Sequence, residues 1–300
     1  MRINLLGNKI PSIKRILPKI DLNSSMKKSD IFIECTPDMF ESTTLRPDFG
    51  KINTPIADEK EYKTLLAKLK HTITHNGNYA YFTENDMEKY GKVDLFEHGL
   101  IPYCGQDDCH SLINAYLGSR LTKLEQEVWK LQMPYDLDTI PDVIRLLEYS
   151  LNRLDNKYGK YKGIVYRNGY FNPLTDKQFY STSTESINAV RHGNNYLPAE
   201  DNQYSIILLK NGHNINEFQK SADSFIARKY AETENEILID RHSVFRLLPE
   251  YKYSEEIKRL QAVLLAQALK KDDDINENDI RKALKNHSDL LKYISVREEI

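Results

Sequence analysis

A change of residue pattern at Gly159 most constrains how this chain can fold. Before it, residues 111–132 and those after Thr139 carry apolar side chains at helical spacing, and Pro141 suits a first helical turn. From Gly159 to about Leu248, short apolar runs alternate with turn-forming residues, which is typical of strands. We therefore expect an α+β fold in which helices precede a mainly antiparallel β core.

The β-prone runs in this stretch are short and well separated. They are Gly163–Tyr166, Phe179–Ser183, Tyr204–Leu209, Glu236–Ile239 and Val244–Leu248. Only Asp240–Ser243 separates the last two, so we expect these two to form a hairpin. Further helices are expected over Glu59–Leu69, over Glu255–Leu269 with Ser254 as its cap, and from about Asp279 to the end.

Charge and hydropathy exclude several classes of protein. Lys and Arg total 42 against 44 Asp and Glu, whereas nucleic-acid-binding proteins usually carry a basic excess, so no nucleic-acid partner is expected. Apolar runs such as Ile206–Leu209 and Ala262–Ala266 are far shorter than the ~20 residues of a membrane-spanning helix, so no membrane partner is expected. The first residues lack a continuous apolar segment, which predicts no N-terminal signal peptide. The three cysteines do not make a disulfide framework and favour a reducing compartment.

Cys104, Cys109 and His110 lie close together in the sequence and allow several interpretations. A zinc site needs four ligands, and this spacing is uncommon for one, so no metal is predicted. Cys109 at the start of a helix would have a lowered thiol pKa and, with a distant histidine, would suit a cysteine nucleophile. Two small buried thiols beside a surface histidine are the structural alternative.

Three polar motifs follow one another in the β region. Arg167 ends a predicted strand, where a guanidinium can contact a diphosphate with two hydrogen bonds. In the run Ser181–Ser183 the first and third side chains share one face of an extended strand. Glu234 and Glu236, if extended, would point the same way, roughly 6.5–7 Å apart. Each motif alone is also typical of a solvated strand end, a polar strand face or an acidic turn.

The ordered set, in the segments VYRNG, FYSTSTE and ETENEILI, resembles the mono-ADP-ribosyltransferases of the R-S-E class, which include cholera-toxin-like and clostridial binary toxins. It is also similar to the compact transferase domains of secreted bacterial effectors, including the SidE-type effectors, where helices precede the β core too. The resemblance implies a catalytic domain over residues 105–252. Residues 1–104 would then form an N-terminal accessory or target-binding region, and residues 253–300 a C-terminal helical extension.

The resemblance also implies the chemistry. NAD would be the co-substrate, no metal would be needed, and ADP-ribose would pass to a host protein. Glu236 would bind the ribose 2′-OH and stabilise an oxocarbenium-like transition state, Ser181 would hold Glu236, and Arg167 would neutralise the phosphates. The remaining expected NAD contacts are Tyr166, Asn168, Thr182, Ser183 and Tyr230.

The pattern Glu234-x-Glu236 is similar to that of the arginine-modifying members of the family, so the resemblance implies arginine as the acceptor. The physical reason is that a guanidinium stays protonated and needs a carboxylate to bind it and take its proton. The chain would be a secreted effector or toxin that reaches the host cytosol without an N-terminal signal, a route that its acidic residues Glu298 and Glu299 also suit. Two alternatives are a catalytically inert binding module of the same fold and a cysteine hydrolase that uses Cys109. The sequence predicts neither the target protein nor the oligomeric state.

Overall fold

A computed structural model describes residues 45–72, 94–104, 109–119, 121–123, 126, 137–169, 171, 177–193, 196–221 and 234–300 of the 300-residue chain. Its α-helices are α1 (Phe49–Ile52), α2 (Glu59–Thr72), α4 (Ile101–Cys104), α5 (Cys109–Leu117), α7 (Ile140–Tyr158), α8 (Ser186–His192), α9 (Ile215–Ser221), α11 (Glu255–Lys270) and α12 (Glu277–His287). Its 3₁₀ helices are η3 (Leu95–Leu100), η4 (Leu137–Thr139), η5 (Glu250–Lys252) and η6 (Ser288–Tyr293). Its strands are β1 (Tyr161–Asn168), β2 (Tyr180–Ser183), β3 (Tyr204–Gly212), β4 (Glu236–Ile239), β5 (Phe245–Leu247) and β6 (Ile294–Glu299).

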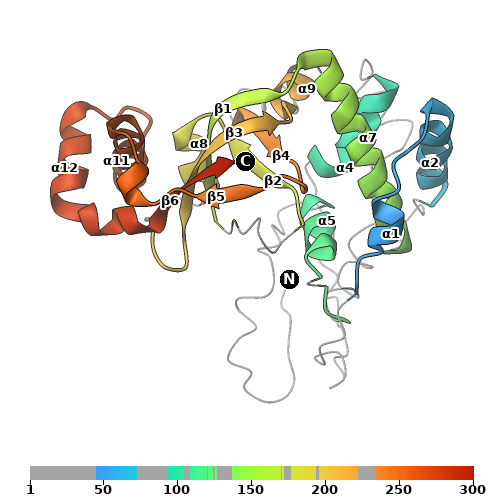
Figure 1. The fold of residues 1–300 in the computed structure, drawn as a ribbon, viewed down its shortest axis with the longest axis horizontal. Helices are drawn as coiled ribbons and strands as arrows, with labels where there is room; N and C mark the ends of the chain where they lie inside the picture. Colours follow the sequence, from blue (N-terminus) through green and yellow to red (C-terminus); the bar gives the residue numbers. More distant parts are fainter. Residues whose placement is uncertain are drawn as a thin grey trace, which may run out of the picture.

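The strands form a six-stranded sheet in the order β4-β2-β1-β3-β6-β5. All neighbours are antiparallel except β3 and β6, which are parallel. Figure 1 shows the sheet in the centre, with α1, α2, α5 and α7 on one side and α11 and α12 on the other. The fold is therefore α+β with a mainly antiparallel sheet, as the sequence predicts.

Three hydrophobic clusters hold these layers together. The first joins α2, α4, α5 and α7 to the β region through residues such as Phe179 and Leu238. The other two lie on opposite faces of the sheet, because successive strand residues point to opposite sides. On β1, Tyr166 packs in the cluster under α11 and α12, whereas its neighbour Val165 packs with Phe171 on the other face.

The longer helices form where the sequence predicts them. Pro141 lies in the first turn of α7, where its missing N–H is not needed, and Gly159 ends the helix with a φ of 80°. Ser254 caps α11 by accepting a hydrogen bond from the Ile257 amide. The helix expected over residues 111–132 is interrupted, because α5 ends at Leu117 and Ser119 has a φ of 52°; most of residues 120–132 lie outside the described residues.

Two expectations for the end of the chain are wrong. The last helix does not continue to the end, because α12 ends at His287 and residues 294–299 form β6. Nor do β4 and β5 form a hairpin, because they lie at opposite edges of the sheet and β5 pairs with β6. The inserted strand β6 is held by Glu299, whose buried carboxylate accepts hydrogen bonds from the amides of Lys210 and Asn211.

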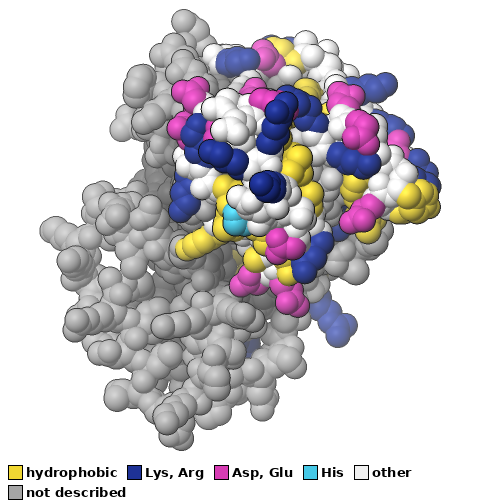
Figure 2. Space-filling model, turned by 90° about the vertical axis from the view of Figure 1, so that its left-hand side faces the viewer, with side chains coloured by type: hydrophobic (Ala, Val, Ile, Leu, Met, Phe, Trp, Pro, Cys, Tyr) yellow, Lys and Arg dark blue, Asp and Glu magenta, His cyan; other side chains and the backbone are white. Residues whose placement is uncertain are grey.

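The helices α11 and α12 present a mixed, charged outer surface. Figure 2 shows acidic and basic side chains interspersed on this side of the molecule. One pair joins the two helices, with Arg259 Nη2 2.8 Å from Glu277 Oε2. Among the described residues, no helix has the length and apolar character that crossing a bilayer requires.

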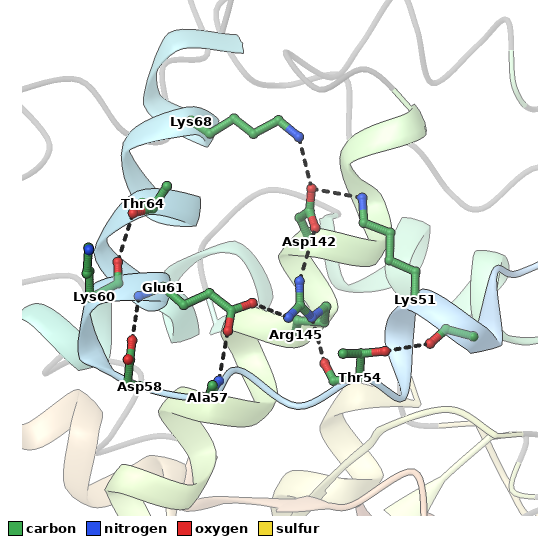
Figure 3. A network of polar contacts seen from close by, with 11 residues as sticks. Lys51, Thr54, Ala57, Asp58, Lys60, Glu61, Thr64, Lys68, Asp142 and Arg145 are labelled. Atoms are coloured by element: carbon green, nitrogen blue, oxygen red, sulfur yellow. Dashed lines mark hydrogen bonds and ion pairs between the residues drawn. The ribbon is translucent and has the colours of Figure 1, made fainter.

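A polar network joins α1, α2 and α7 (Figure 3). Asp142 of α7 is buried, and its Oδ2 accepts hydrogen bonds from Lys51 Nζ at 2.9 Å and Lys68 Nζ at 3.3 Å. Arg145, one turn further along α7, donates to the Thr54 carbonyl at 2.7 Å and pairs with Glu61. Helices α1 and α2 are therefore held against α7 by ion pairs and hydrogen bonds as well as by apolar packing.

Asp142→Ala is expected to lower the free energy of unfolding by about 2 kcal/mol, because it removes the buried carboxylate that Lys51 and Lys68 contact and one of the two carboxylates that pair with the buried Arg145. The measurement is urea unfolding followed by circular dichroism. Glu59→Ala is the control, since its partner Lys63 and Glu59 itself are both more than half exposed and such pairs contribute under ~1 kcal/mol. Equal effects of the two substitutions would contradict the prediction.

Candidate active site

One pocket of about 320 Å³ opens at the ends of β1, β2 and β4. Helices α4, α5, α8 and α9 complete its wall. The predicted site residues that line it are Tyr166, Arg167, Asn168, Ser181, Thr182, Ser183, Glu234 and Glu236. Tyr230 lies outside the described residues. The three motifs that are separate in the sequence thus meet in one pocket, on three adjacent strands.

Glu236 is the first residue of β4 and is 9% exposed. It lies opposite Ser183 on β2, and its Oε2 accepts a hydrogen bond from Gln219 Nε2 at 3.2 Å. Burial raises the pKa of Glu236, while hydrogen bonds from Ser181 and Gln219 act in the opposite direction. The site therefore holds a desolvated carboxylate in a fixed orientation.

Glu234 is oriented differently from the expected extended Glu-x-Glu strand. Asn235 has a φ of 48°, in the left-handed region that asparagine tolerates best after glycine, and β4 begins only at Glu236. The two carboxylates therefore do not extend from one regular strand, although both line the pocket. Burial and then the neighbouring Glu236 carboxylate raise the pKa of Glu234 to about 7.

The side-chain hydroxyls of Ser181, Thr182 and Ser183 on β2 make different contacts. Ser181 is hydrogen-bonded to the Glu236 carboxylate. Thr182 Oγ1 donates to the Ile237 carbonyl at 2.6 Å, and Ser183 Oγ donates to the Glu234 carbonyl at 2.5 Å. Thr182 and Ser183 thus attach β2 to the backbone that carries both carboxylates, and Ser181 acts on the carboxylate itself.

Arg167 extends from β1 toward β2. Its Nη1 donates to the Ser181 carbonyl at 2.5 Å, and its guanidinium lies 5.2 Å from the centre of the Tyr180 ring. Burial lowers the pKa of Arg167, but an arginine stays charged at neutral pH. Asn168 packs against Gly193, where a Cβ would lie 1.7 Å from its Nδ2, so a larger residue at position 193 would displace the Asn168 side chain.

The pocket is also lined by residues outside these three motifs, of which Cys104 and His110 belong to the cysteine–histidine cluster noted in the sequence. These further lining residues are Tyr103, Cys104, His110, Ala189, His192 and Gln219. Tyr103 is buried, its hydroxyl accepts a hydrogen bond from Asn114 Nδ2 at 3.2 Å, and it is also hydrogen-bonded to Ser181. His192 Nε2 lies 4.0 Å from Glu234 Oε1, while burial and the Arg167 charge lower its pKa. These residues lie on helices α4, α5, α8 and α9, and it is the folding of the chain that brings them to the pocket.

The cysteines of the alternative interpretation have different surroundings. Cys109 begins α5, as expected for a helix start. Cys104 lines the pocket, where burial and then the charges of Glu236 and Glu234 raise its thiol pKa well above the usual value. A thiol in these surroundings is protonated at neutral pH and is a poor nucleophile.

A search against protein-family models and a search of the curated proteins find no match. Among solved structures, the chain is similar to the ADP-ribosyltransferase Vis in complex with the M6 inhibitor, with 19% identity, a TM-score of 0.34, and coverage of 68% of this chain and 84% of that one. It is also similar to the Vis toxin, an ADP-ribosyltransferase from Vibrio splendidus, with 18% identity, a TM-score of 0.31, and coverage of 84% and 89%. At these identities and TM-scores the similarity concerns the fold alone.

Proposed function

We propose that this chain is an NAD-dependent mono-ADP-ribosyltransferase that modifies arginine side chains of a host protein. The observation that supports the proposal is the meeting of Arg167, Ser181 and Glu236 in one pocket, from the adjacent strands β1, β2 and β4. The proposed acceptor protein lies in a host cell, which the chain would reach by secretion without an N-terminal signal, as the resemblance to secreted effectors implies.

The pocket residues suit one end of a dinucleotide. A volume of about 320 Å³ is at the lower end of the ~300–1,000 Å³ range of small-molecule pockets, so it would hold the reacting end and leave the rest outside. Arg167 would contact the phosphates, and Tyr166 and Asn168 lie beside it on β1. NAD would supply the ADP-ribosyl group, with nicotinamide as a neutral leaving group.

The two carboxylates have separate proposed roles. Glu236, buried and held by Ser181 and Gln219, would stabilise the positive charge that develops on the ribose when its bond to nicotinamide breaks. A guanidino nitrogen of the acceptor arginine would form the new bond to the ribose carbon that nicotinamide leaves. Glu234, with its pKa near 7, would bind the guanidinium and take the proton that the attacking nitrogen loses.

The test is incubation of the protein with labelled NAD and a eukaryotic cell lysate. A labelled host protein whose label is released by hydroxylamine with the kinetics of an arginine linkage would support the proposal. NAD left intact by the wild-type protein, with and without lysate, would contradict it. In that case a thiol-reactive probe directed at Cys109 would test the cysteine hydrolase.

Glu234→Gln is expected to abolish protein labelling while free NAD hydrolysis continues at about the wild-type rate. The reason is that Glu234 acts on the acceptor and Glu236 on the ribose. Since the pKa of Glu234 is raised, its ionised form gains as pH rises through about 7, and the wild-type ratio of transfer to hydrolysis should rise over the same range. Nicotinamide release and protein labelling, measured side by side, check this.

The matched control is Glu185→Gln, which changes an exposed glutamate just after β2. It should leave both reactions and their ratio unchanged. If Glu234→Gln lowers hydrolysis and transfer by the same factor, the division of roles between the two carboxylates is wrong.

A further inference from the structure

Helix α9 lies directly against the turn that carries the two carboxylates. Its residues Asn216 and Gln219 are one turn apart and therefore share a face of the helix. Asn216 Nδ2 donates to Asn235 Oδ1 at 3.3 Å, and Gln219 Nε2 donates to Glu236 Oε2 at 3.2 Å. One short helix thus contacts the left-handed residue between the glutamates and the second glutamate itself.

The helix is well placed to act as a rigid support. Ile215 and Phe218 are buried in the same cluster as α7 and Leu238 of β4. Just before the helix, His213 exchanges two backbone hydrogen bonds with Leu238, each 2.9 Å long. A side chain on this helix therefore keeps a fixed position relative to β4.

The amide of Gln219 is not explained by stability alone. Gln219 is 3% exposed, and within the described residues no donor reaches its buried Oε1. An unpaired buried carbonyl group destabilises a fold, whereas an apolar side chain of the same size would avoid that loss. The amide nitrogen, in contrast, has a charged acceptor at the site of the proposed reaction.

We propose that Gln219 is a positioning residue, which holds the Glu236 carboxylate against the ribose while Ser181 holds it from β2. The inference rests on the proposed transferase function for its catalytic meaning, but the contact itself is a property of the protein without substrate. Gln219 and Ser181 come from separate elements, so the carboxylate is fixed from two directions.

The test substitutes Gln219 by methionine, which has a similar volume and no donor. The loss of one hydrogen bond to a charged group should lower kcat for NAD cleavage roughly tenfold, with little change in KM. Because that hydrogen bond lowers the pKa of Glu236, the pKa should rise in Gln219→Met, and the acid limb of the kcat profile should move to higher pH. The melting temperature should stay near that of the wild type.

The Glu236 pKa is measured directly by ¹³C NMR of labelled glutamate carboxyls, with the resonance assigned from its loss in Glu236→Gln. The matched control is Gln261→Met on α11, a glutamine that is also buried but donates to the Ile294 carbonyl. It should leave kcat and the Glu236 pKa unchanged. If Gln219→Met does not fold, Gln219→Glu serves instead, and its second carboxyl group should raise the Glu236 pKa further.

The possible failures are distinguishable. A wild-type protein that cleaves no NAD would overturn the proposed function. A Glu236 pKa that is the same in the wild type and in Gln219→Met would overturn the role of Gln219, whatever the protein does to NAD. A fall in kcat with an unchanged pH profile and a lower melting temperature would also overturn it, because that result describes a purely structural residue.

Discussion

Glu236→Gln is expected to lower both protein labelling and free NAD hydrolysis by roughly 10²–10³-fold, the range found when one preorganised electrostatic group is removed. The substitution keeps the size of the side chain, removes its negative charge and turns one acceptor oxygen into an N–H donor. That charge is already desolvated and held by Ser181 and Gln219, so in the proposed reaction it would stabilise a developing cation more strongly than a solvated carboxylate. Nicotinamide release at saturating NAD measures the effect.

The pH dependence gives a second check on Glu236. Its pKa is raised by burial, so the wild-type rate should fall as the carboxylate takes up a proton on the acid side. Glu217→Gln on α9 is the control, because that side chain is partly exposed and pairs with Lys220 instead of lining the pocket. Hydrolysis at the wild-type rate in Glu236→Gln would contradict the catalytic assignment.

The candidate site could be predicted because each of its motifs is local. Arg167, Ser181 and Glu236 each lie in or beside a short β-prone run, and strand periodicity fixes which neighbours share a face. Tyr103 and Gln219 could not be found in this way. They contact Ser181 and Glu236 from the separate helices α4 and α9, and no motif in the sequence around either residue indicates the contact.

The strands at the end of the chain show the same limit. Residues 294–299, with the sequence ISVREE, form β6, but their three charged residues are not typical of a strand, so the sequence did not predict one there. In the fold, Glu299 is buried and accepts hydrogen bonds from backbone amides and from Ser243, and Glu298 pairs with Arg246. The prediction of a hairpin between β4 and β5 was wrong for a related reason. Short spacing favours local pairing, but β6 pairs with β5 instead, at the opposite edge of the sheet from β4.

His213→Ala is expected to lower the free energy of unfolding by about 3 kcal/mol near neutral pH, the scale of removing one partner from a buried ion pair. The imidazole is 2% exposed and lies between two carboxylates. Its Nδ1 is 3.0 Å from both oxygens of Asp155 on α7, and its Nε2 is 3.2 Å from Asp240 Oδ2, directly after β4. Without it, two partly or fully buried carboxylates would lose their shared cation, and the strand that carries Glu236 would lose a link to the helical layer.

The pH dependence of that loss tests whether His213 is charged. Burial lowers its pKa, but the hydrogen bonds and charges of Asp155 and Asp240 outweigh burial, so the folded-state pKa lies above the ordinary value of 6.5. The stability that this provides is fully present below the unfolded-state pKa and is lost as pH rises through the folded-state pKa. Burial opposes the ionisation of Asp240, yet hydrogen bonds from His213 and the His242 amide bring its pKa to about 2, so the carboxylate stays ionised throughout.

The difference between wild type and His213→Ala in urea unfolding should therefore be largest at about pH 6, below the unfolded-state pKa, and smaller at a high pH above the folded-state pKa. The control is His242→Ala, which removes a histidine whose side chain is 56% exposed and should change stability by less than ~0.5 kcal/mol at either pH. A loss of the same size at both pH values would mean that His213 acts through packing alone. A loss that shrinks at high pH would instead identify a protonated imidazole as the group that joins α7, the end of β3 and the end of β4, and so keeps β4 in place beneath the site.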